Sequence, residues 1–361
     1  MTVDSLYFDM VRRAIRLARR AQGYTSPNPA VGAVLFDENG IISEGYHKKA
    51  GLAHAEIIAI ERAGGKARGA SLAVSLEPCC HTGRTGPCTK AIAAAGIKRV
   101  IYAVKDPNCK VNGGGREYLR EQGIDVISNI CREEALILNE DYFHYHNTGR
   151  PFVVLKMAQT LDGRIATATG ESKWISAKKA RAFAHRLRAR YDAVAVGSGT
   201  VKADNPSLTV RHVKGKNPYR IILTASGKLA SNINLFENND DNKTIVAAPA
   251  NILKKMNFNK VVGWSISKTK NGINLLDLLE HAGKEGIMSI LFEGGARIAT
   301  ELFSKRMVNK FYLSCSPVLI GKGLNSIGEL GIKNIPDGIK FRNSSFRKMG
   351  TDILFSGYPV W

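Results

Sequence analysis

The chain has 361 residues, 44% of them hydrophobic and 23% charged, and a formal net charge of +21. This composition is typical of globular proteins and excludes a disordered chain, and the length indicates two domains. No stretch reaches the roughly 18 uncharged apolar residues of a membrane span, and residues 1–4 lack the apolar segment of a signal peptide. We therefore expect a cytoplasmic protein without a membrane partner. Six cysteines do not make a disulfide scaffold in a chain of this length, and three of them lie close together, which indicates metal or catalytic chemistry.

The first half alternates helices with strands. Apolar residues at helical spacing predict a helix over 7–21, and the turn at 37–40 joins the predicted strands 30–36 and 41–45. Further helices are predicted at 54–63, 89–95 and 113–122, and further strands at 71–76, 100–104 and 125–127. This order is typical of an α/β domain.

The polar segment 147–151, which contains Gly149 and Pro151, is the best candidate for a domain boundary. We place the domains at residues 1–149 and 150–361. In the second domain, strands are predicted at 152–157, 193–196, 220–223, 244–247, 288–292, 311–314 and 352–355, and helices at 177–190, 275–282 and 297–303. This domain is also predicted to be α/β.

The positive charge is concentrated in the second domain. Residues 1–149 carry 19 basic and 16 acidic side chains, whereas residues 150–361 carry 33 and 15. Such a surplus favours an acidic partner, either nucleic acid or a small molecule with several phosphates. The densest basic run, residues 178–190, contains one Phe, Tyr or Trp residue, Phe183, so it lacks the interleaved aromatics that favour nucleic acid. We expect phosphorylated small molecules and no nucleic-acid partner.

A histidine, a glutamate and two cysteines form the strongest motif of the first domain. His54 and Glu56 open a predicted helix, Cys79 ends a strand, and Cys88 follows nine residues later. One imidazole and two thiolates suit a catalytic zinc site whose fourth position holds water. Zinc lowers the pKa of such a water towards neutrality, and Glu56 can carry its proton to a leaving amine. The pattern is typical of zinc deaminases.

The spacing departs from that pattern, because eight residues rather than two separate the cysteines. Cys80 and His81 are therefore rival ligands. The side chain of Cys80 should point away from that of its neighbour Cys79, whereas His81 can face the same pocket. Each residue alone fits a core histidine or a structural thiol, but the combination favours a zinc site formed by His54, Cys79 and Cys88.

The second domain lacks the GxGxxG motif of dinucleotide-binding folds. Its strongest local signal is the run Phe-Glu-Gly-Gly-Ala at 292–296, where a strand ends, two glycines allow close backbone approach and a helix begins. Free N–H groups at such a helix start can bind a phosphate. A tight strand-to-helix turn without a ligand gives the same pattern.

Together these motifs resemble the RibD family of bifunctional riboflavin biosynthesis enzymes. The long insertion between the cysteines sets this family apart from tRNA and cytidine deaminases, and the resemblance spans nearly the whole chain in the right order. It is carried by the segments 27–32 (PNPAVG), 54–56 (HAE), 76–79 (LEPC), 81–88 (HTGRTGPC), 106–108 (DPN), 156–158 (KMA), 161–164 (LDGR), 170–175 (GESKWI), 199–201 (GTV), 204–211 (DNPSLTVR) and 293–296 (EGGA).

The resemblance implies a cytidine-deaminase-like three-layer α/β/α domain followed by a dihydrofolate-reductase-like α/β domain. The first would use one zinc ion per chain to remove an amino group from a phosphoribosylated diaminopyrimidinone. The second would use NADPH to reduce the ribosyl group of the resulting aminouracil to ribityl. We also expect a homo-oligomer.

The resemblance also assigns residues to roles. The zinc ligands would be His54, Cys79 and Cys88, with Glu56 as the proton shuttle. The remaining assignments are binding contacts: Asn28, His81 and Arg84 for the substrate of the deaminase; Ala158, Trp174, Thr200, Asp204, Gly294, Gly295 and Ala296 for NADPH; and Lys156, Ser172, Arg188, Leu208, Arg211 and Glu293 for the substrate of the reductase. An Asx-type turn at Asn28 and a core position for Trp174 are the alternatives.

Two other function classes explain parts of the sequence. A nucleic-acid deaminase with a basic binding domain would account for the zinc motif and the charge. It would not account for the near-neutral first domain, the cysteine spacing or the reductase-like motifs. A structural zinc module would account for the ligands but would give Glu56 no role.

Overall fold

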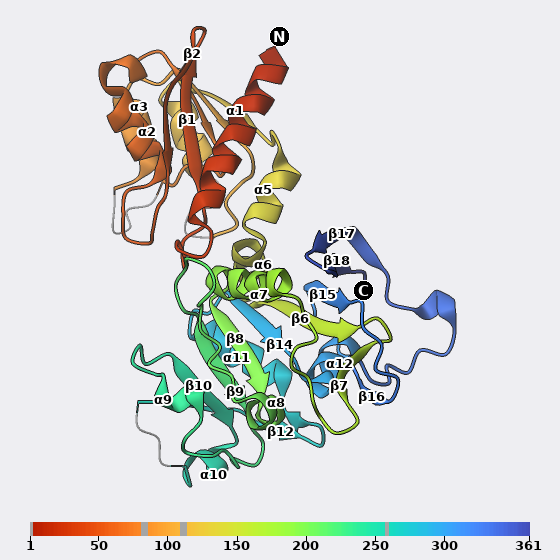
Figure 1. Cartoon of the computed structure of the whole chain (residues 1–361). Coiled ribbons are helices and arrows are strands. Elements are labelled where there is room, and N and C mark those ends of the chain that lie inside the picture. Colours follow the sequence, from red (N-terminus) through yellow and green to blue (C-terminus); the bar gives the residue numbers. More distant parts are fainter. Residues whose placement is uncertain (1–2, 81–85, 109–113, 257–259) are drawn as a thin grey trace. The chain divides into compact units, whose positions relative to one another are not determined.

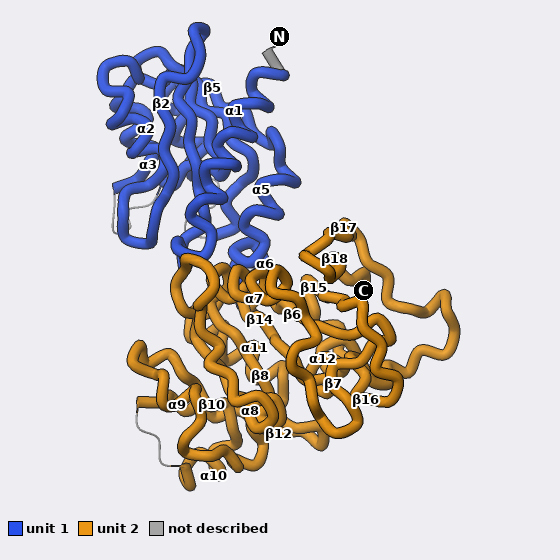
Figure 2. The backbone as a smooth tube through the Cα atoms, viewed as in Figure 1, with its two compact units in different colours: residues 1–149 blue, residues 150–361 orange. Residues whose placement is uncertain are grey.

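The computed structural model describes residues 3–80, 86–108, 114–256 and 260–361. The chain forms two compact units, residues 1–149 and 150–361, which Figure 2 shows in separate colours. Within the described ranges, no helix combines the length and the apolar character needed to cross a membrane.

Unit 1 is built on a five-stranded sheet with the order β2-β1-β3-β4-β5. Figure 1 labels two of these strands, β1 and β2. Strand β1 runs antiparallel to both of its neighbours, whereas β3, β4 and β5 are parallel. The strands are β1 (Gly32–Asp37), β2 (Gly40–Tyr46), β3 (Ser71–Val74), β4 (Arg99–Tyr102) and β5 (Asp125–Ser128). The helices are α1 (Val3–Ala18), α2 (Ala55–Ala63), α3 (Cys88–Ala94), α4 (Gly114–Glu121), α5 (Arg132–Leu138) and α6 (Glu140–Thr148).

Helices cover both faces of this sheet. Alternate residues of β1 enter different cores, because side chains on a strand point to opposite faces in turn. Val34 and Phe36 pack in a core shared with α1 and α5, and Ala33 and Leu35 pack in a core shared with α2, α3 and α4. The predicted three-layer α/β/α fold is therefore confirmed.

Unit 2 is built on a nine-stranded sheet with the order β11-β10-β9-β8-β14-β6-β15-β18-β17. The first seven strands in this order are parallel, and β18 and β17 are antiparallel additions at one edge. The strands are β6 (Phe152–Thr160), β8 (Ala193–Gly197), β9 (Tyr219–Leu223), β10 (Thr244–Ala248), β11 (Val262–Ser265), β14 (Ser289–Glu293), β15 (Lys310–Ser316), β17 (Phe341–Met349) and β18 (Asp352–Pro359).

The central strands of this sheet are buried on both faces, as the run of apolar residues in β8 shows. Ala193 and Ala195 pack in a core with α11 and α12, whereas Val194 and Val196 pack in a core with α7, α8 and α9. The helices are α7 (Lys178–Arg190), α8 (Ser198–Asp204), α9 (Asn234–Glu237), α10 (Ala250–Leu253), α11 (Leu275–Lys284) and α12 (Ala296–Ser304). Two small antiparallel sheets pair β12 (Lys268–Thr269) with β13 (Gly272–Ile273) and β7 (Arg164–Thr167) with β16 (Gly323–Asn325).

Several elements differ from the prediction. The first helix begins at Val3 and ends at Ala18, and its predicted last turn is a short 3₁₀ helix, Arg19–Ala21. Helices α5 and α6 and strand β17 were not predicted. Most side chains of β17 are exposed, so this edge strand lacks the apolar alternation from which strands are predicted.

Gly32 allows α1 to lie directly against β1. A Cβ atom at this position would lie 2.1 Å from the carbonyl oxygen of Ala14 and 2.9 Å from the amide nitrogen of Ala18. Both are backbone atoms of α1, which cannot move aside as a flexible side chain can. The side-chain-free position 32 therefore sets how closely α1 packs on the sheet.

We predict that Gly32→Ala lowers the free energy of unfolding by about 1–3 kcal/mol, because α1 must move away from the sheet. Denaturant unfolding followed by circular dichroism measures this change. Gly65→Ala is the matched control: a Cβ there meets no atom within 4 Å, so its effect should stay within about 0.5 kcal/mol. Equal losses in the two variants would contradict the proposed packing constraint.

Candidate active sites

In unit 1, the start of α2 places His54 and Glu56 beside the sheet. His54 is the N-cap residue of α2, with extended backbone angles, and Glu56 lies in the first turn with a side chain only 3% exposed. Helix α2 can pack this closely against β2 because residue 45 is glycine. A Cβ atom there would lie 2.3 Å from the carbonyl oxygen of Ala55. The close packing buries Glu56 next to the imidazole.

Cys79 and Cys88 meet His54 from two other segments. Cys79 follows the carboxyl end of β3, and Cys88 is the buried first residue of α3. The His54 Nδ1 atom lies 3.1 Å from the Sγ of Cys88 and 3.5 Å from the Sγ of Cys79. These three atoms lie within 4.8 Å of one another. The structure thus brings the three predicted ligands together, although 34 residues separate the first from the last.

Cys80, a rival ligand, is directed elsewhere. A Cβ atom at Gly114, the first residue of α4, would lie 2.6 Å from the Sγ of Cys80, so this sulfur occupies the space beside that glycine. It does not belong to the group of converging donor atoms around His54. His81, the other rival, and Arg84 lie outside the described residues, so their predicted contacts stay predictions.

The buried groups of this cluster shift one another's pKa values. Burial raises the pKa of Glu56 to about 7. Hydrogen bonding with Cys88 lowers the pKa of the Cys79 thiol to about 4, and hydrogen bonding with His54 adds to this effect. The backbone N–H of Cys88 also donates to the Sγ of Cys79 over 3.4 Å. The surroundings therefore favour a thiolate at Cys79, which is the form that binds a metal ion.

Asn28 is held at the edge of this cluster by a histidine that the sequence analysis missed. His47 Nδ1 donates to the carbonyl oxygen of Ala53 over 3.1 Å, so its Nε2 can accept from the Asn28 side-chain nitrogen, also at 3.1 Å. Burial lowers the pKa of His47, which keeps this acceptor available at neutral pH. The His47 ring stands edge-on to the His54 ring, with 5.4 Å between centroids. Asn28 therefore has a fixed orientation beside the candidate metal ligands.

In unit 2, a buried ion pair joins α7 to the end of β14. Arg188 donates from Nε and from Nη2 to the two carboxylate oxygens of Glu293, both at 2.6 Å, and each side chain is only 12% exposed. Lys156 is aligned with Glu293 in the register of the parallel strands β6 and β14, and burial lowers the pKa of its amine. Burial is the largest single effect on the Glu293 carboxyl and would raise its pKa, but the charge of Arg188, its hydrogen bonds and the charge of Lys156 together lower it. Three predicted substrate residues thus form one charged group.

The two glycines after β14 lie against α8. Gly294 and Gly295 have φ angles of +70° and +77°, a region that other residues enter only with strain. A Cβ at Gly295 would lie 3.4 Å from the Thr200 hydroxyl oxygen. Ala296 then begins α12, and Ala158 lies partly exposed on the neighbouring strand β6. Thr200 and the diglycine turn, both predicted to touch NADPH, are therefore adjacent.

Other predicted NADPH and substrate residues gather around Asp204. The Ser172 hydroxyl donates to the Asp204 carboxylate over 3.2 Å, which links a predicted substrate residue to a predicted cofactor residue. Trp174 is 72% exposed, so the alternative of a core aromatic is wrong. The guanidinium of Arg181 lies over its ring, 4.6 Å from the centroid.

Leu208 and Arg211 follow on the segment after α8. The Leu208 side chain is 2% exposed and belongs to the core, so any contact with a ligand would come from its backbone. The Arg211 side chain is exposed, and its backbone N–H donates to His185 Nδ1 over 3.2 Å.

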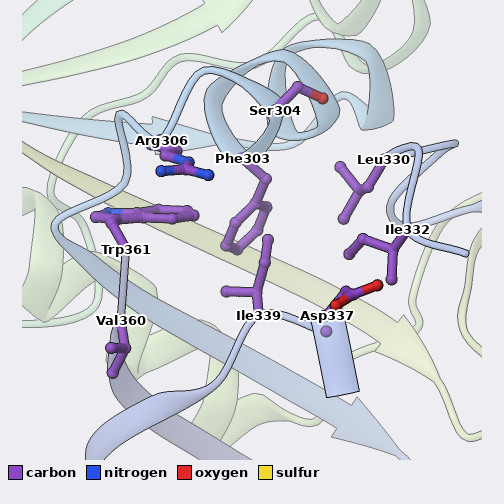
Figure 3. Close-up of a pocket in the computed structure, with 10 residues that line it drawn as sticks. Phe303, Ser304, Arg306, Leu330, Ile332, Asp337, Ile339, Val360 and Trp361 are labelled. Atoms are coloured by element: carbon purple, nitrogen blue, oxygen red, sulfur yellow. The ribbon is translucent and has the colours of Figure 1, made fainter. Parts of the chain in front are cut away.

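A pocket of about 220 Å³ lies elsewhere in unit 2, between α12 and the C-terminal segment (Figure 3). Phe303, Ile339 and Trp361 give it an apolar wall, and Arg306 and Asp337 add charge. None of the residues predicted for the zinc, NADPH or substrate sites lines it.

Two family models match the chain. Residues 5–104 match the cytidine and deoxycytidylate deaminase zinc-binding region, and residues 151–355 match the RibD C-terminal domain. The riboflavin biosynthesis protein RibD of Aquifex aeolicus is 44% identical, with 98% of this chain and 97% of that protein covered. The chain belongs to the RibD family.

Solved structures of this family extend over both units. RibD of Acinetobacter baumannii, in its first crystal form, has a TM-score of 0.90 and 33% identity, with 99% of this chain and 100% of that chain covered. A Thermotoga maritima deaminase/reductase has a TM-score of 0.89 and 36% identity at the same coverage. The family and the two-domain α/β fold predicted from the sequence are therefore confirmed.

Proposed function

We propose that this chain catalyses two consecutive steps of riboflavin biosynthesis. Unit 1 removes an amino group from a phosphoribosylated diaminopyrimidinone by hydrolysis, and unit 2 reduces the ribosyl group of the product to ribityl. Zinc is the cofactor of the first reaction and NADPH that of the second. The observation that carries this conclusion is the convergence of His54, Cys79 and Cys88 beside the buried Glu56, in a chain that belongs to the RibD family over both units.

The donor atoms in unit 1 fit a zinc ion. One imidazole nitrogen and two sulfurs match the ligand types and the number of protein ligands in catalytic zinc sites. Zinc, when bound, supplies the Lewis acidity that makes water a nucleophile at neutral pH. We assign His54, Cys79 and Cys88 as its ligands.

The other residues of unit 1 handle the proton and the substrate. Glu56 is buried beside His54 but is not one of the three converging donors, so its carboxylate can take a proton from water and give it to the leaving amine. Asn28 presents an amide, oriented by His47, that can pair with the edge of the pyrimidine. His81 and Arg84 are assigned to the same substrate by the family resemblance.

In unit 2, we assign backbone N–H groups to a phosphate of the cofactor and charged side chains mainly to the substrate. NADPH, when bound, supplies the hydride for the reduction. The diglycine turn and the amino end of α12 present backbone N–H groups suited to a phosphate, and Ala158, Trp174, Thr200, Asp204 and Ala296 complete the assigned cofactor contacts. For the substrate, Arg211 offers an exposed guanidinium to the phosphate, and Lys156, Ser172, Arg188, Leu208 and Glu293 form the remaining contacts.

Three expectations from the sequence stay predictions. They are assembly into a homo-oligomer, a cytoplasmic location and the absence of a nucleic-acid partner. A gel shift at several salt concentrations tests the last, because phosphate-driven binding weakens steeply as salt rises.

The proposal predicts that the product formed depends on whether NADPH is present. With the diaminopyrimidinone phosphate alone, the chain should release ammonia and form the ribosylaminouracil phosphate. With NADPH added, the same substrate should yield the ribityl product. Mass spectrometry of the two mixtures identifies each compound, and an unchanged substrate in both would contradict the proposed function.

We predict that Glu56→Gln slows ammonia release by about 100- to 10,000-fold, because the amide cannot accept and return the proton. The variant should still bind one zinc ion per chain and reduce the deaminated substrate at the normal rate. Glu61→Gln, an exposed position on the same helix, is the matched control and should behave as the parent chain. Normal ammonia release by Glu56→Gln would exclude the proton-transfer role.

We predict that chelation of zinc abolishes ammonia release but leaves the reductase step within about twofold of its original rate, since the assigned ligands all lie in unit 1. NADPH oxidation on the deaminated substrate, with circular dichroism to check the fold, measures this. If reduction disappeared from a chain that stayed folded, the division of labour between the units would be wrong.

A further inference from the structure

The segment after α8 carries two of the assigned substrate residues but has no regular structure of its own. Asn205 caps α8 with a φ of +42°, and Leu208 has a φ of +53°, so two residues before Arg211 hold left-handed backbone angles that side chains other than glycine seldom adopt. Outside helices and strands, the buried backbone groups of a segment need hydrogen-bond partners from other backbone, from side chains or from water. The contacts that provide these partners determine where Arg211 lies.

Among the described residues, three side chains bond to the backbone of residues 209–211, at the end of this segment. Asn217 accepts a hydrogen bond from the N–H of Val210 at 2.9 Å. Arg188 Nη1 donates to the carbonyl oxygen of Thr209 at 3.3 Å, while its other nitrogens hold Glu293. His185 Nδ1 accepts from the N–H of Arg211 at 3.2 Å. Two of these anchors lie on α7.

His185 and Arg188 are three residues apart on α7 and therefore share a face of the helix. The His185 side chain is 5% exposed, and its ring stands edge-on to that of His212, with 4.5 Å between centroids. One helix face thus holds both the carboxylate partner Arg188 and the acceptor for the Arg211 amide. The position of Arg211 is coupled to that of the Arg188–Glu293 pair through a rigid element.

The bond to Arg211 requires a neutral imidazole, because a protonated ring has no lone pair at Nδ1. Burial lowers the pKa of His185 to about 4, and the charges of Arg188, His212 and Arg211 add to this effect, whereas Glu293 opposes it. The ring therefore stays an acceptor over the physiological pH range. In this state its Nε2 carries the proton.

We propose that His185 is a positioning residue of the reductase site, which holds the Arg211 backbone so that the Arg211 guanidinium meets the phosphate of the substrate. This inference rests on the proposed function, in which Arg211 binds that phosphate. His185 itself touches neither substrate nor cofactor in this role. Its effect should therefore appear in the binding of the phosphorylated substrate rather than in the chemical step.

The test uses the full-length chain and steady-state NADPH oxidation on the phosphorylated ribosylaminouracil. His185→Phe keeps an aromatic ring beside His212 but removes the acceptor, and it should raise the KM for this substrate about tenfold with kcat within about twofold. The KM for NADPH should not change. His185→Asn keeps an acceptor close to the position of Nδ1 and should restore the KM to within about threefold of the original.

Arg211→Ala distinguishes the phosphate-binding role of Arg211 from the positioning role of His185. It should raise the same KM at least as much, and adding His185→Phe to Arg211→Ala should change the KM by less than about twofold, because the positioned side chain is gone. If Arg211→Ala leaves the KM unchanged, the phosphate assignment in the proposed function is wrong. If Arg211→Ala raises the KM but His185→Phe does not, or if the two effects multiply in the double variant, the role of His185 is wrong.

A purely structural role would give a different result. It would lower kcat and raise the KM for NADPH together, and His185→Asn would not rescue the enzyme; this pattern would overturn the proposal. Should His185→Phe fail to fold, His185→Leu, which also lacks an acceptor, takes its place in the same comparison.

Discussion

In each unit, part of the candidate site lies where neighbouring parallel strands end. The carboxyl ends of parallel strands lie at one edge of a sheet, so the segments that follow them converge there. In unit 1, Cys79 lies just beyond β3, and the N–H of Glu77 in the same segment bonds to Val104 beyond the parallel strand β4. In unit 2, Glu293 ends β14 and Gly197 ends the adjacent parallel strand β8. The parallel pairing of the strands therefore brings these segments together, and the chemistry of each site depends on that pairing.

Burial then decides which of the converging groups carry charge. In unit 2 the Arg188 guanidinium is buried with Glu293 as its carboxylate partner, and the charges of Arg188 and Lys156 both act to lower the pKa of that carboxyl. His185, close to the same arginine, stays neutral because it is buried among positive charges. A protonated His185 would add a buried positive charge close to Arg188 and Arg211, so the neutral ring is favoured there.

The sequence predicted the features that depend on local pattern. Strands buried on both faces appear as apolar runs, and the turn at Gly294 and Gly295 appears as a pair of glycines, which the structure places at positive φ. Contacts between distant segments left no such signal. His47 and His185 are single histidines in their segments, and their role comes from partners 19 and 26 residues away. Asp162 is a further example, because its carboxylate accepts the backbone N–H groups of Ile320 and Gly321, more than 150 residues along the chain.

The two sites also differ in how well their residues can be predicted from the sequence. The unit 1 site consists of side chains that meet around one point, and such a site is visible as a short list of reactive residue types at fixed spacing. The unit 2 site consists of a backbone turn, an ion pair and an anchored segment, whose residues are ordinary when taken singly. The bond from Ser172 to Asp204 shows the consequence: it ties a residue assigned to the substrate to one assigned to the cofactor. Because each side chain orients the other, we expect a change at Asp204 to disturb the assigned contacts of both ligands.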